Sequence, residues 1–427
     1  MSKLEDRLQA HLTRVTATAP TAGFESRVLP KAIVHQAPLP KSSWAGQVVT
    51  VGALIAVGVA VLIGLRAFHE GPAVKSKTAP KPPAATSPIP ATTFYVIQMF
   101  NSKAGWALTD QGLFRTSDDW MHWIKAGPTG IPLAGRDTTD FLNESTAWVA
   151  TFQVNNPQVV TVLRTVDAGR TWQQSSIVDP NSAGPAQLDF IDAQHGWLLV
   201  GYGAAASNEG VGLYRTSDGG QHWTLIEQTL GLGHDAPGSL PFGCGKAGES
   251  FLSLTTGWVS GNCAAGGAFL AITHDGGLTW QSQVLPGTEG VIYQSPATSP
   301  PTFFSARDGY LVFFQGSTGS VLYTTTDGGQ SWAPHPLPQL PGGLAPTVYF
   351  QSLDNGWIIS GDGSLVYQTT DGGLRWTTYR PTPALKEVGS VDFIDSQRGL
   401  AEAISSNNQS VLLQTTDGGR TWQQIAP

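Results

Sequence analysis

Thr325–Trp332 reads TTDGGQSW, and this stretch decides the fold because the chain writes it seven times. Each copy has Thr, then Asp two residues later, then Trp five residues after the Asp. The aspartates are Asp118, Asp167, Asp218, Asp275, Asp327, Asp371 and Asp417. The tryptophans are Trp123, Trp172, Trp223, Trp280, Trp332, Trp376 and Trp422. A step of about fifty residues between copies is typical of a repeat architecture.

The residue types of this element indicate a tight turn between two strands. The Asp carboxylate accepts hydrogen bonds from nearby backbone N–H groups, and Gly allows the positive φ that such a turn requires. The β-branched Thr suits the end of the incoming strand, while the Trp gives the outgoing strand a large apolar side chain to bury. Gly stands two places after the Asp in six copies, and Trp120 takes that place in the first.

A second repeated element, a Gly followed by an aromatic residue within an apolar run, precedes the Asp turns. HGWLL at His195–Leu199 and NGWII at Asn355–Ile359 are two examples. Alternating strand patterns such as AQLDFID at Ala186–Asp192 stand just before it. One period therefore contains four strands, which is the content of a propeller blade. We predict an all-β, seven-bladed β-propeller of four-stranded antiparallel blades that fills residues 93–427.

The turn resembles the Asp-box (BNR) repeat, Ser/Thr-x-Asp-x-Gly-x-Thr/Ser-Trp. Together with the Gly-Trp strand, the whole period resembles the photosystem II stability/assembly factor family of seven-bladed propellers. The resemblance covers the propeller and no part of the first 92 residues. It implies a protein-binding or assembly role and, by resemblance only, a link to photosynthesis. Asp boxes also occur in sialidases and xyloglucanases, so the motif indicates the fold more than the function.

The first 92 residues have a different organisation. Residues 44–66 contain an uncharged run, WAGQVVTVGALIAVGVAVLIGL, which is long enough for one transmembrane helix. Residues 1–43 form a short segment with an amphipathic pattern at Leu4, Leu8 and Leu12, and residues 67–92 form a linker rich in Pro and Ala. A Pro-rich segment is a semi-rigid spacer. We expect an uncleaved anchor that places the N-terminus in the cytoplasm and the propeller outside the cell membrane.

Small residues recur every four positions along the predicted membrane helix, at Gly52, Ala56, Ala60 and Gly64. This pattern lets two helices approach closely and suggests a homodimer, although Gly and Ala are also common in such anchors. The amphipathic segment before it leaves a second alternative open, a transmembrane sensor that signals through the N-terminal segment.

Charge excludes one class of partner. Residues 1–92 carry ten Lys and Arg against four Asp and Glu, whereas residues 93–427 carry 14 against 27. An acidic propeller repels phosphate backbones, so we expect no nucleic-acid binding.

The sequence offers little support for catalysis. A sialidase-like glycoside hydrolase is the alternative that the Asp boxes raise, and it needs arginines that converge on a substrate carboxylate. Arg115, Arg164 and Arg215 each precede an Asp box, so blade periodicity points them away from a common centre. We expect no enzyme activity, no catalytic residues, no metal and no cofactor.

The irregular connections are the better candidates for binding. With the strands of a blade lettered a to d, the a–b and c–d turns lie on one face, and the b–c and d–a connections lie on the other. The long connections are d–a, at residues 127–140, 229–249, 283–300 and 335–346. We expect a protein partner to bind this d–a face, because loops can vary there without disturbing the scaffold. Neutral insertion is the alternative explanation of each loop.

Cys244 and Cys263 are the only cysteines. They flank the first two strands predicted for the fourth blade, FLSL and GWVSG, and antiparallel neighbours bring such positions together. An exported domain meets an oxidising environment in which a disulfide persists. We predict that the two cysteines pair, with two unrelated buried thiols as the alternative.

Overall fold

The computed structural model describes residues 92–425 except 121, 154, 185, 206–207, 232–235, 264–266, 289–296, 316–318, 342–345 and 406–408. The predicted N-terminal segment 1–43, membrane helix 44–66 with its small-residue face, and linker 67–92 up to residue 91 lie outside these residues. Within the part described, no helix has the length and hydropathy needed to span a bilayer.

The described residues form seven antiparallel sheets in chain order, which confirms the all-β seven-bladed propeller. Blade 1 contains β1 (Phe94–Met99), β2 (Ala104–Thr109), β3 (Gly112–Ser117) and β4 (Ile124–Lys125). Blade 2 contains β5 (Thr138–Phe141), β6 (Ala147–Gln153), β7 (Asn156–Thr165) and β8 (Gln173–Val178). Blade 3 contains β9 (Ala186–Phe190), β10 (Gly196–Ala205), β11 (Asn208–Thr216) and β12 (Thr224–Thr229). Blade 4 contains β13 (Cys244–Phe251), β14 (Gly257–Cys263), β15 (Ala268–Thr273) and β16 (Gln281–Ser282).

In blade 5 the first strand is divided into two short pieces that both pair with the second strand. Blade 5 contains β17 (Ala297–Thr298), β18 (Thr302–Phe303), β19 (Gly309–Phe314), β20 (Ser320–Thr325) and β21 (Ala333–Pro336). Blade 6 contains β22 (Thr347–Phe350), β23 (Gly356–Ile359), β24 (Val366–Thr369) and β25 (Thr377–Tyr379). Blade 7 contains β26 (Ser390–Phe393), β27 (Gly399–Ile404), β28 (Ser410–Thr415) and β29 (Gln423–Gln424).

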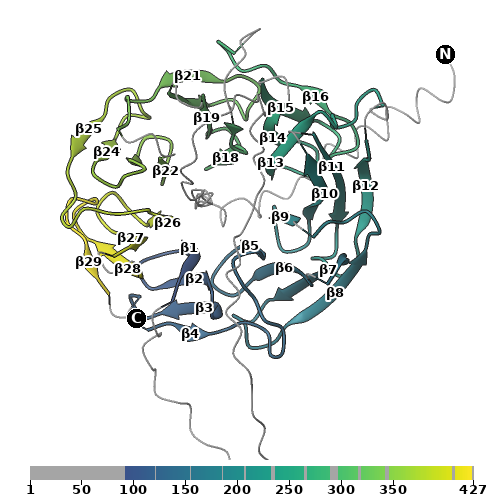
Figure 1. Ribbon diagram of the computed structural model, residues 1–427, viewed down its shortest axis with the longest axis horizontal. Helices are drawn as coiled ribbons and strands as arrows, with labels where there is room; N and C mark the ends of the chain where they lie inside the picture. The colour runs from purple at the N-terminus through teal and green to yellow at the C-terminus, as the bar shows by residue number, and fades with distance from the viewer. Residues whose placement is uncertain are drawn as a thin grey trace, which may run out of the picture.

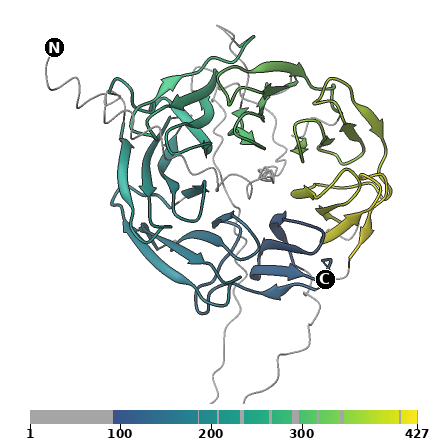
Figure 2. The ribbon, with the colours of Figure 1, turned by 180° about the vertical axis from the view of Figure 1, so that it is seen from behind.

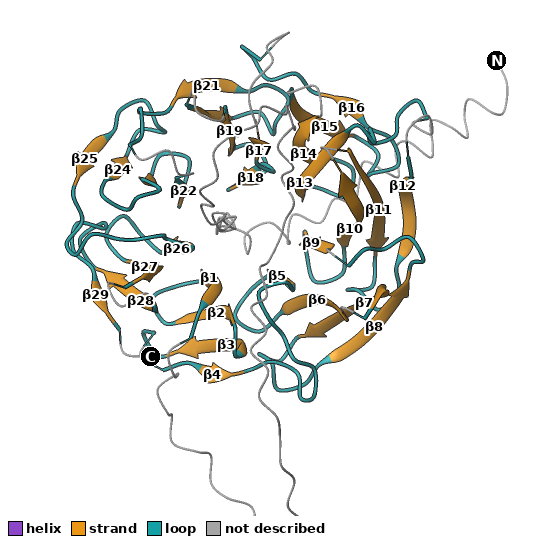
Figure 3. Ribbon diagram, in the orientation of Figure 1, coloured by secondary structure: helices purple, strands orange, loops and turns teal. Residues whose placement is uncertain are grey.

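The blades stand around a common centre with their first strands innermost and their fourth strands at the rim (Figure 1). The view from behind shows the same closed ring, with the last blade beside the first (Figure 2). Strands and loops make up all of the described chain (Figure 3). The strands of each blade come from one continuous stretch of chain. Blades 7 and 1 are therefore neighbours that belong to separate sheets.

Aromatic rings join neighbouring blades. The Trp of a second strand stacks on the Phe that ends the first strand of the next blade, with ring centroids 3.8 Å apart for Trp148 and Phe190. That Phe also meets the Asp-box Trp of its own blade edge-on, as Phe190 does with Trp223. The Gly before Trp197 is required, because a Cβ on Gly196 would lie 2.4 Å from the Phe190 ring. Such aromatic pairs add about 0.5–1.5 kcal/mol beyond the area they bury.

A ring of polar contacts accompanies the aromatic contacts at the innermost strands. The residue before the Phe reaches the backbone of the next blade: Asp140 accepts the Phe190 N–H at 2.5 Å, and Asp189 accepts the Phe251 N–H at 2.5 Å. In blade 7 the corresponding Asp392 accepts the Met99 N–H and so links the last blade to the first. These carboxylates satisfy backbone donors at the blade junctions.

The junction between blades 7 and 1, called the seam below, has a different composition. Leu400 replaces the second-strand Trp, Met99 replaces the Phe, and both are fully buried. Trp120, the one departure from Gly in the Asp boxes, packs into the same cluster. In blade 5 this place excludes a side chain, because a Cβ on Gly329 would lie 2.4 Å from Trp258 of the preceding blade. At the seam, therefore, the Trp comes from the Asp-box turn of blade 1 instead of from the second strand of blade 7.

This exchange predicts a compensating pair of substitutions. Leu400→Trp should lower the free energy of unfolding by about 1–3 kcal/mol, because the new ring enters space that Trp120 fills. Trp120→Gly should leave a cavity, although Gly relieves the positive φ of 68° that Trp120 adopts. The double variant should recover part of the loss. Denaturant unfolding of all four proteins gives the coupling energy, and simple additivity would contradict the exchange.

Candidate functional site

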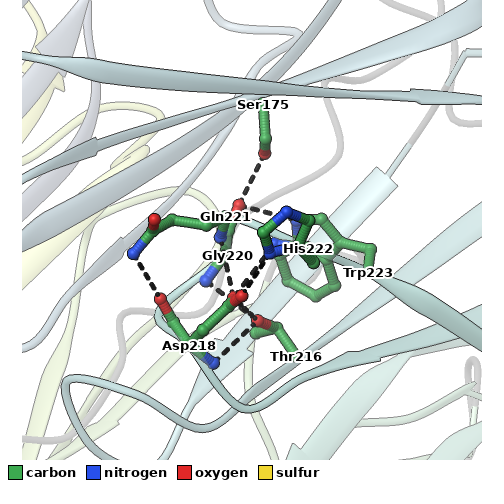
Figure 4. Close-up of polar contacts among 7 residues, drawn as sticks. All are labelled: Ser175, Thr216, Asp218, Gly220, Gln221, His222 and Trp223. Atoms are coloured by element: carbon green, nitrogen blue, oxygen red, sulfur yellow. Dashed lines mark hydrogen bonds and ion pairs between the residues drawn. The ribbon is translucent and has the colours of Figure 1, made fainter.

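The Asp box of blade 3 shows how the predicted carboxylates are used (Figure 4). Asp218 Oδ1 accepts the Thr216 hydroxyl at 2.8 Å and the His222 backbone N–H at 3.0 Å. Its Oδ2 lies 2.6 Å from His222 Nδ1. The Thr216 hydroxyl oxygen in turn accepts the Gly220 N–H at 2.9 Å. Side chain and backbone thus close one turn between the third and fourth strands.

All seven predicted aspartates occupy such turns. In every copy the carboxylate accepts the hydroxyl of the Thr two residues before it and the N–H four residues after it. The hydroxyl and backbone N–H of Thr171 lower the pKa of Asp167 to about 2. Slight burial acts against the hydrogen bonds from Ser331 at Asp327, yet the pKa there also falls to about 2. The Asp-box carboxylates therefore hold turns as ionised acceptors.

The seven predicted tryptophans pack against the blades. Trp123, Trp280, Trp332 and Trp422 are buried, and Trp172, Trp223 and Trp376 are partly buried. Several also secure a neighbouring backbone: Trp172 Nε1 donates to the Ala126 carbonyl at 2.8 Å, across the junction of blades 1 and 2. These contacts give the tryptophans a structural use.

The three arginines that precede Asp boxes do not come together. Arg164 lies over the Trp148 ring and donates to the Ala193 carbonyl of the next blade at 2.9 Å. Arg215 lies over the Trp197 ring in the same manner. Arg115 points towards the Ala168 carbonyl of blade 2. Each guanidinium therefore faces a different blade junction, and the three do not form a common anion-binding centre.

The connection before blade 4 is the most elaborate part of the d–a face. Leu240 is fully buried between blades 3 and 4, its N–H donates to Glu227 at 3.1 Å, and its carbonyl accepts the Thr229 hydroxyl at 2.8 Å. Two residues earlier, the Gly238 carbonyl accepts the backbone N–H of Trp280, the last residue of the blade 4 Asp box, at 2.7 Å, so the connection reaches from the d–a face to that turn. The described part of this connection is thus packed and hydrogen-bonded into the wedge between two blades.

A disulfide and a lysine fix the end of the same connection. Cys244 and Cys263 stand opposite each other in β13 and β14 and are joined by a disulfide. The Lys246 ammonium donates to the carbonyls of Glu209, Pro241 and Cys244 at 2.6–2.8 Å. Together they attach the connection to blades 3 and 4. The sequence indicated the cysteine pair, but the caged lysine carries no local signal.

Other d–a connections insert a leucine in the same way. Leu133, Leu285 and Leu385 are at most 5% exposed and pack between blades 1 and 2, 4 and 5, and 6 and 7. Three of the long connections, 127–140, 229–249 and 283–300, thus each place a buried leucine in the junction that they cross. Backbone around these leucines remains at the surface, with Ala236 and Lys386 as exposed examples.

A hydrogen-bonded phenol pair lies where blades 2 and 3 meet on the d–a face. Tyr202 and Tyr214 both donate to Asp179 Oδ2, at 2.8 and 2.7 Å. Gly212 is needed beside them, because a Cβ there would lie 2.1 Å from the Tyr202 hydroxyl. Burial raises the pKa of both phenols, so they remain protonated donors. This network stiffens the face and was not found from the sequence, because its members come from different strands.

No group of three or more His, Cys, Asp and Glu residues suited to a metal occurs among the residues that the structure describes.

The turn geometry predicts a stability effect at the Asp boxes. Asp327→Ala should lower the free energy of unfolding by about 1–3 kcal/mol at neutral pH, because backbone and hydroxyl donors lose their acceptor. The pKa of Asp327 is depressed, so its contribution is present above pH ~4 and is lost towards pH 2. Chemical denaturation at several pH values tests this.

Asp354→Ala is the matched control, because Asp354 is an exposed carboxylate on the same face, outside the Asp boxes. It should change stability by less than about 0.5 kcal/mol. Equal effects of the two substitutions would remove the structural role assigned to the box.

Comparison with known proteins agrees with the propeller fold. Residues 278–426, less than half of the chain, match the family described as DUF6242 beta propeller domain. No curated protein matches the sequence. Among solved structures, YCF48 bound to D1 peptide is 20% identical, with 67% of this chain and 80% of that chain covered and a TM-score of 0.41. The BP39L lectin from Burkholderia pseudomallei is 14% identical, with 76% and 97% covered and a TM-score of 0.49. The GH74 xyloglucanase from Xanthomonas campestris is 14% identical, with 80% of each chain covered and a TM-score of 0.33. The sheet topology makes the chain a seven-bladed β-propeller, and these solved structures are what it is similar to.

Proposed function

We propose that this chain is a membrane-anchored, extracytoplasmic scaffold that binds a protein partner on the d–a face of its propeller. The observation that carries the proposal is the contrast between the two faces. On the opposite face, called the Asp-box face, seven near-identical turns use their polar side chains internally. On the d–a face the connections differ in length and sequence, yet the described parts are packed in place.

Preorganisation is what makes such a surface suited to protein recognition. A loop that is already ordered loses little conformational entropy when it binds. The connection at residues 236–243 is held by Leu240, by the Lys246 contacts and by the disulfide at Cys244. The uncharged segment 44–66 and the Pro-rich linker 67–92 support display of this surface at a membrane.

The glycosidase alternative receives less support. Three arginines that a carboxylated sugar would need face three separate blade junctions, and the Asp-box carboxylates are engaged in turns. Incubation with a fluorogenic sialoside and with xyloglucan oligosaccharides tests that alternative directly, and turnover would replace the scaffold proposal.

Site-specific crosslinking tests the binding face. A photo-crosslinking residue at Leu230, directly after β12, or at Lys386 on the d–a face should give discrete adducts when the full chain is expressed in its native membrane. The same residue at Gln221 or Gln330 on the Asp-box face is the control and should give none. All four positions are exposed. Adducts confined to the Asp-box positions, or absent from all four, would contradict the assignment of the d–a face.

Membrane topology is tested independently. A reporter that is active only outside the cytoplasm, fused after Pro427, should be active, because we place the propeller beyond the anchor. Protease added to intact spheroplasts should digest the propeller. A propeller that is degraded only after lysis would reverse the topology while leaving the binding face untouched.

A further inference from the structure

The seam between blades 7 and 1 contains a buried acid at a second-strand position that is uncharged in every other blade. Glu402 of β27 is 3% exposed and stands two residues after Leu400, facing blade 1. The residues at this position of the other blades are uncharged and buried: Leu108, Ala150, Leu199, Ser260, Val312 and Ile359. A carboxylate in such a place is costly unless a cation accompanies it.

The seat of Glu402 is built for a carboxyl group but supplies no cation. Its Oε1 accepts the Ser410 hydroxyl at 2.5 Å, and its Oε2 accepts the Gly389 N–H at 3.1 Å. A Cβ on Gly389 would lie 2.4 Å from Oε2, so the glycine leaves room for the acid. Among the described residues, Glu402 has no ion pair with Lys, Arg or His.

The other charged or titratable groups around it are acidic or phenolic. Glu387 lies on the connection that enters blade 7. Tyr95 of β1, whose ring packs towards blade 2 at Gly135, interacts with Glu402 electrostatically. The charge of Asp110, in the turn between β2 and β3, also contributes to raising the pKa of Tyr95. Burial, with a smaller effect of Glu387, raises the pKa of Glu402 to about 7 against the hydrogen bonds that lower it.

Asp392 places a second buried acid at the same seam. It accepts the Met99 N–H of blade 1 and the Tyr349 hydroxyl of blade 6, the latter at 2.5 Å. Burial raises its pKa to about 7, although both hydrogen bonds act in the opposite direction. Two acids that border one interface thus share the same response to pH.

We propose that the seam is a pH-dependent closure of the ring, held most tightly when Glu402 and Asp392 are protonated. When the seam opens, both groups meet water and regain their ordinary pKa values, 4.5 and 3.8. Between those values and about 7 the open form releases protons that the closed form keeps, so closure weakens as pH rises. Above about pH 7 both forms are ionised and the effect levels off.

The same seam holds the start of the propeller. Thr92 donates to Asp110, and Phe94 packs edge-on against Trp123 with centroids 6.0 Å apart. Loosening of the seam therefore reaches the residues that directly follow the linker. The inference stands independently of the proposed partner, because it concerns closure of the ring alone.

Hydrogen exchange of the full chain at pH 5 and pH 8, corrected for intrinsic exchange rates, tests the proposal. Protection of β1 amides should fall at pH 8 relative to protection of β19 in blade 5. At the junctions on either side of blade 5, uncharged residues take the places of Asp392 and Glu402: Ser250 and Ser260 on one side, Thr302 and Val312 on the other. A pKa raised from 4.5 to about 7 corresponds to on the order of 100-fold in the opening equilibrium.

Substitutions test whether Glu402 and Asp392 cause the pH dependence of protection. The double variant E402Q/D392N should show less than about threefold change between the two pH values, because neither amide titrates. E144Q makes the same chemical change at an exposed site of blade 2 and should behave as the wild type. If the double variant does not fold, E402L is measured instead, since Leu and Ile occupy this position in other blades, and it should lose the share that Glu402 contributes. The proposal is wrong if the β1-to-β19 ratio of protection in the wild type is the same at both pH values. A full pH response that persists in the double variant, or in E402L, would overturn it equally.

Discussion

The fold depends on the junction between consecutive blades. A four-stranded sheet exposes two faces, and burial against neighbours on both sides is what makes a ring of such sheets stable. Here the junction is a Trp of one blade stacked on a Phe of the next, as for Trp197 and Phe251 at 3.7 Å. An acid on the innermost strand of the first blade accepts a backbone N–H of the next blade, as Asp189 does from Phe251. One contact supplies buried area and the other fixes the register between blades.

Much of the repeated sequence follows from that junction. The Gly before the Trp leaves room for the Phe ring of its own blade, and a Gly of the Asp box leaves room for the Trp of the preceding blade. The Asp box itself then presents its Gly carbonyl to that Trp: Trp148 Nε1 donates to Gly219 at 2.9 Å. The turn therefore stabilises two blades at once, which explains why the motif recurs with so little variation.

The sequence could predict the features that recur in each period. It could not predict the contacts that join residues from different periods. The blade count and the turns follow from local patterns such as Thr325–Trp332, and the pairing of Cys244 with Cys263 follows from adjacent strands. The contacts of Lys246, and the phenol pair at Asp179, join strands from separate parts of the chain. Glu402 lies between these cases, because alignment of the seven periods would have shown one charge in an uncharged column.

The junction that closes the ring is the one at which no chain segment connects the two blades among the residues that the structure describes. Four of the other junctions bury a leucine of the connection that crosses them, as Leu240 and Leu385 show. At the seam, no connection links blade 7 to blade 1 among the described residues, so side chains alone must specify the contact. Trp120 of blade 1 and Leu400 of blade 7 fit each other there, and this pair of side chains occurs at no other junction. Two buried acids, Glu402 and Asp392, then make this least constrained junction sensitive to protons, because burying a charge without a counter-ion is unfavourable.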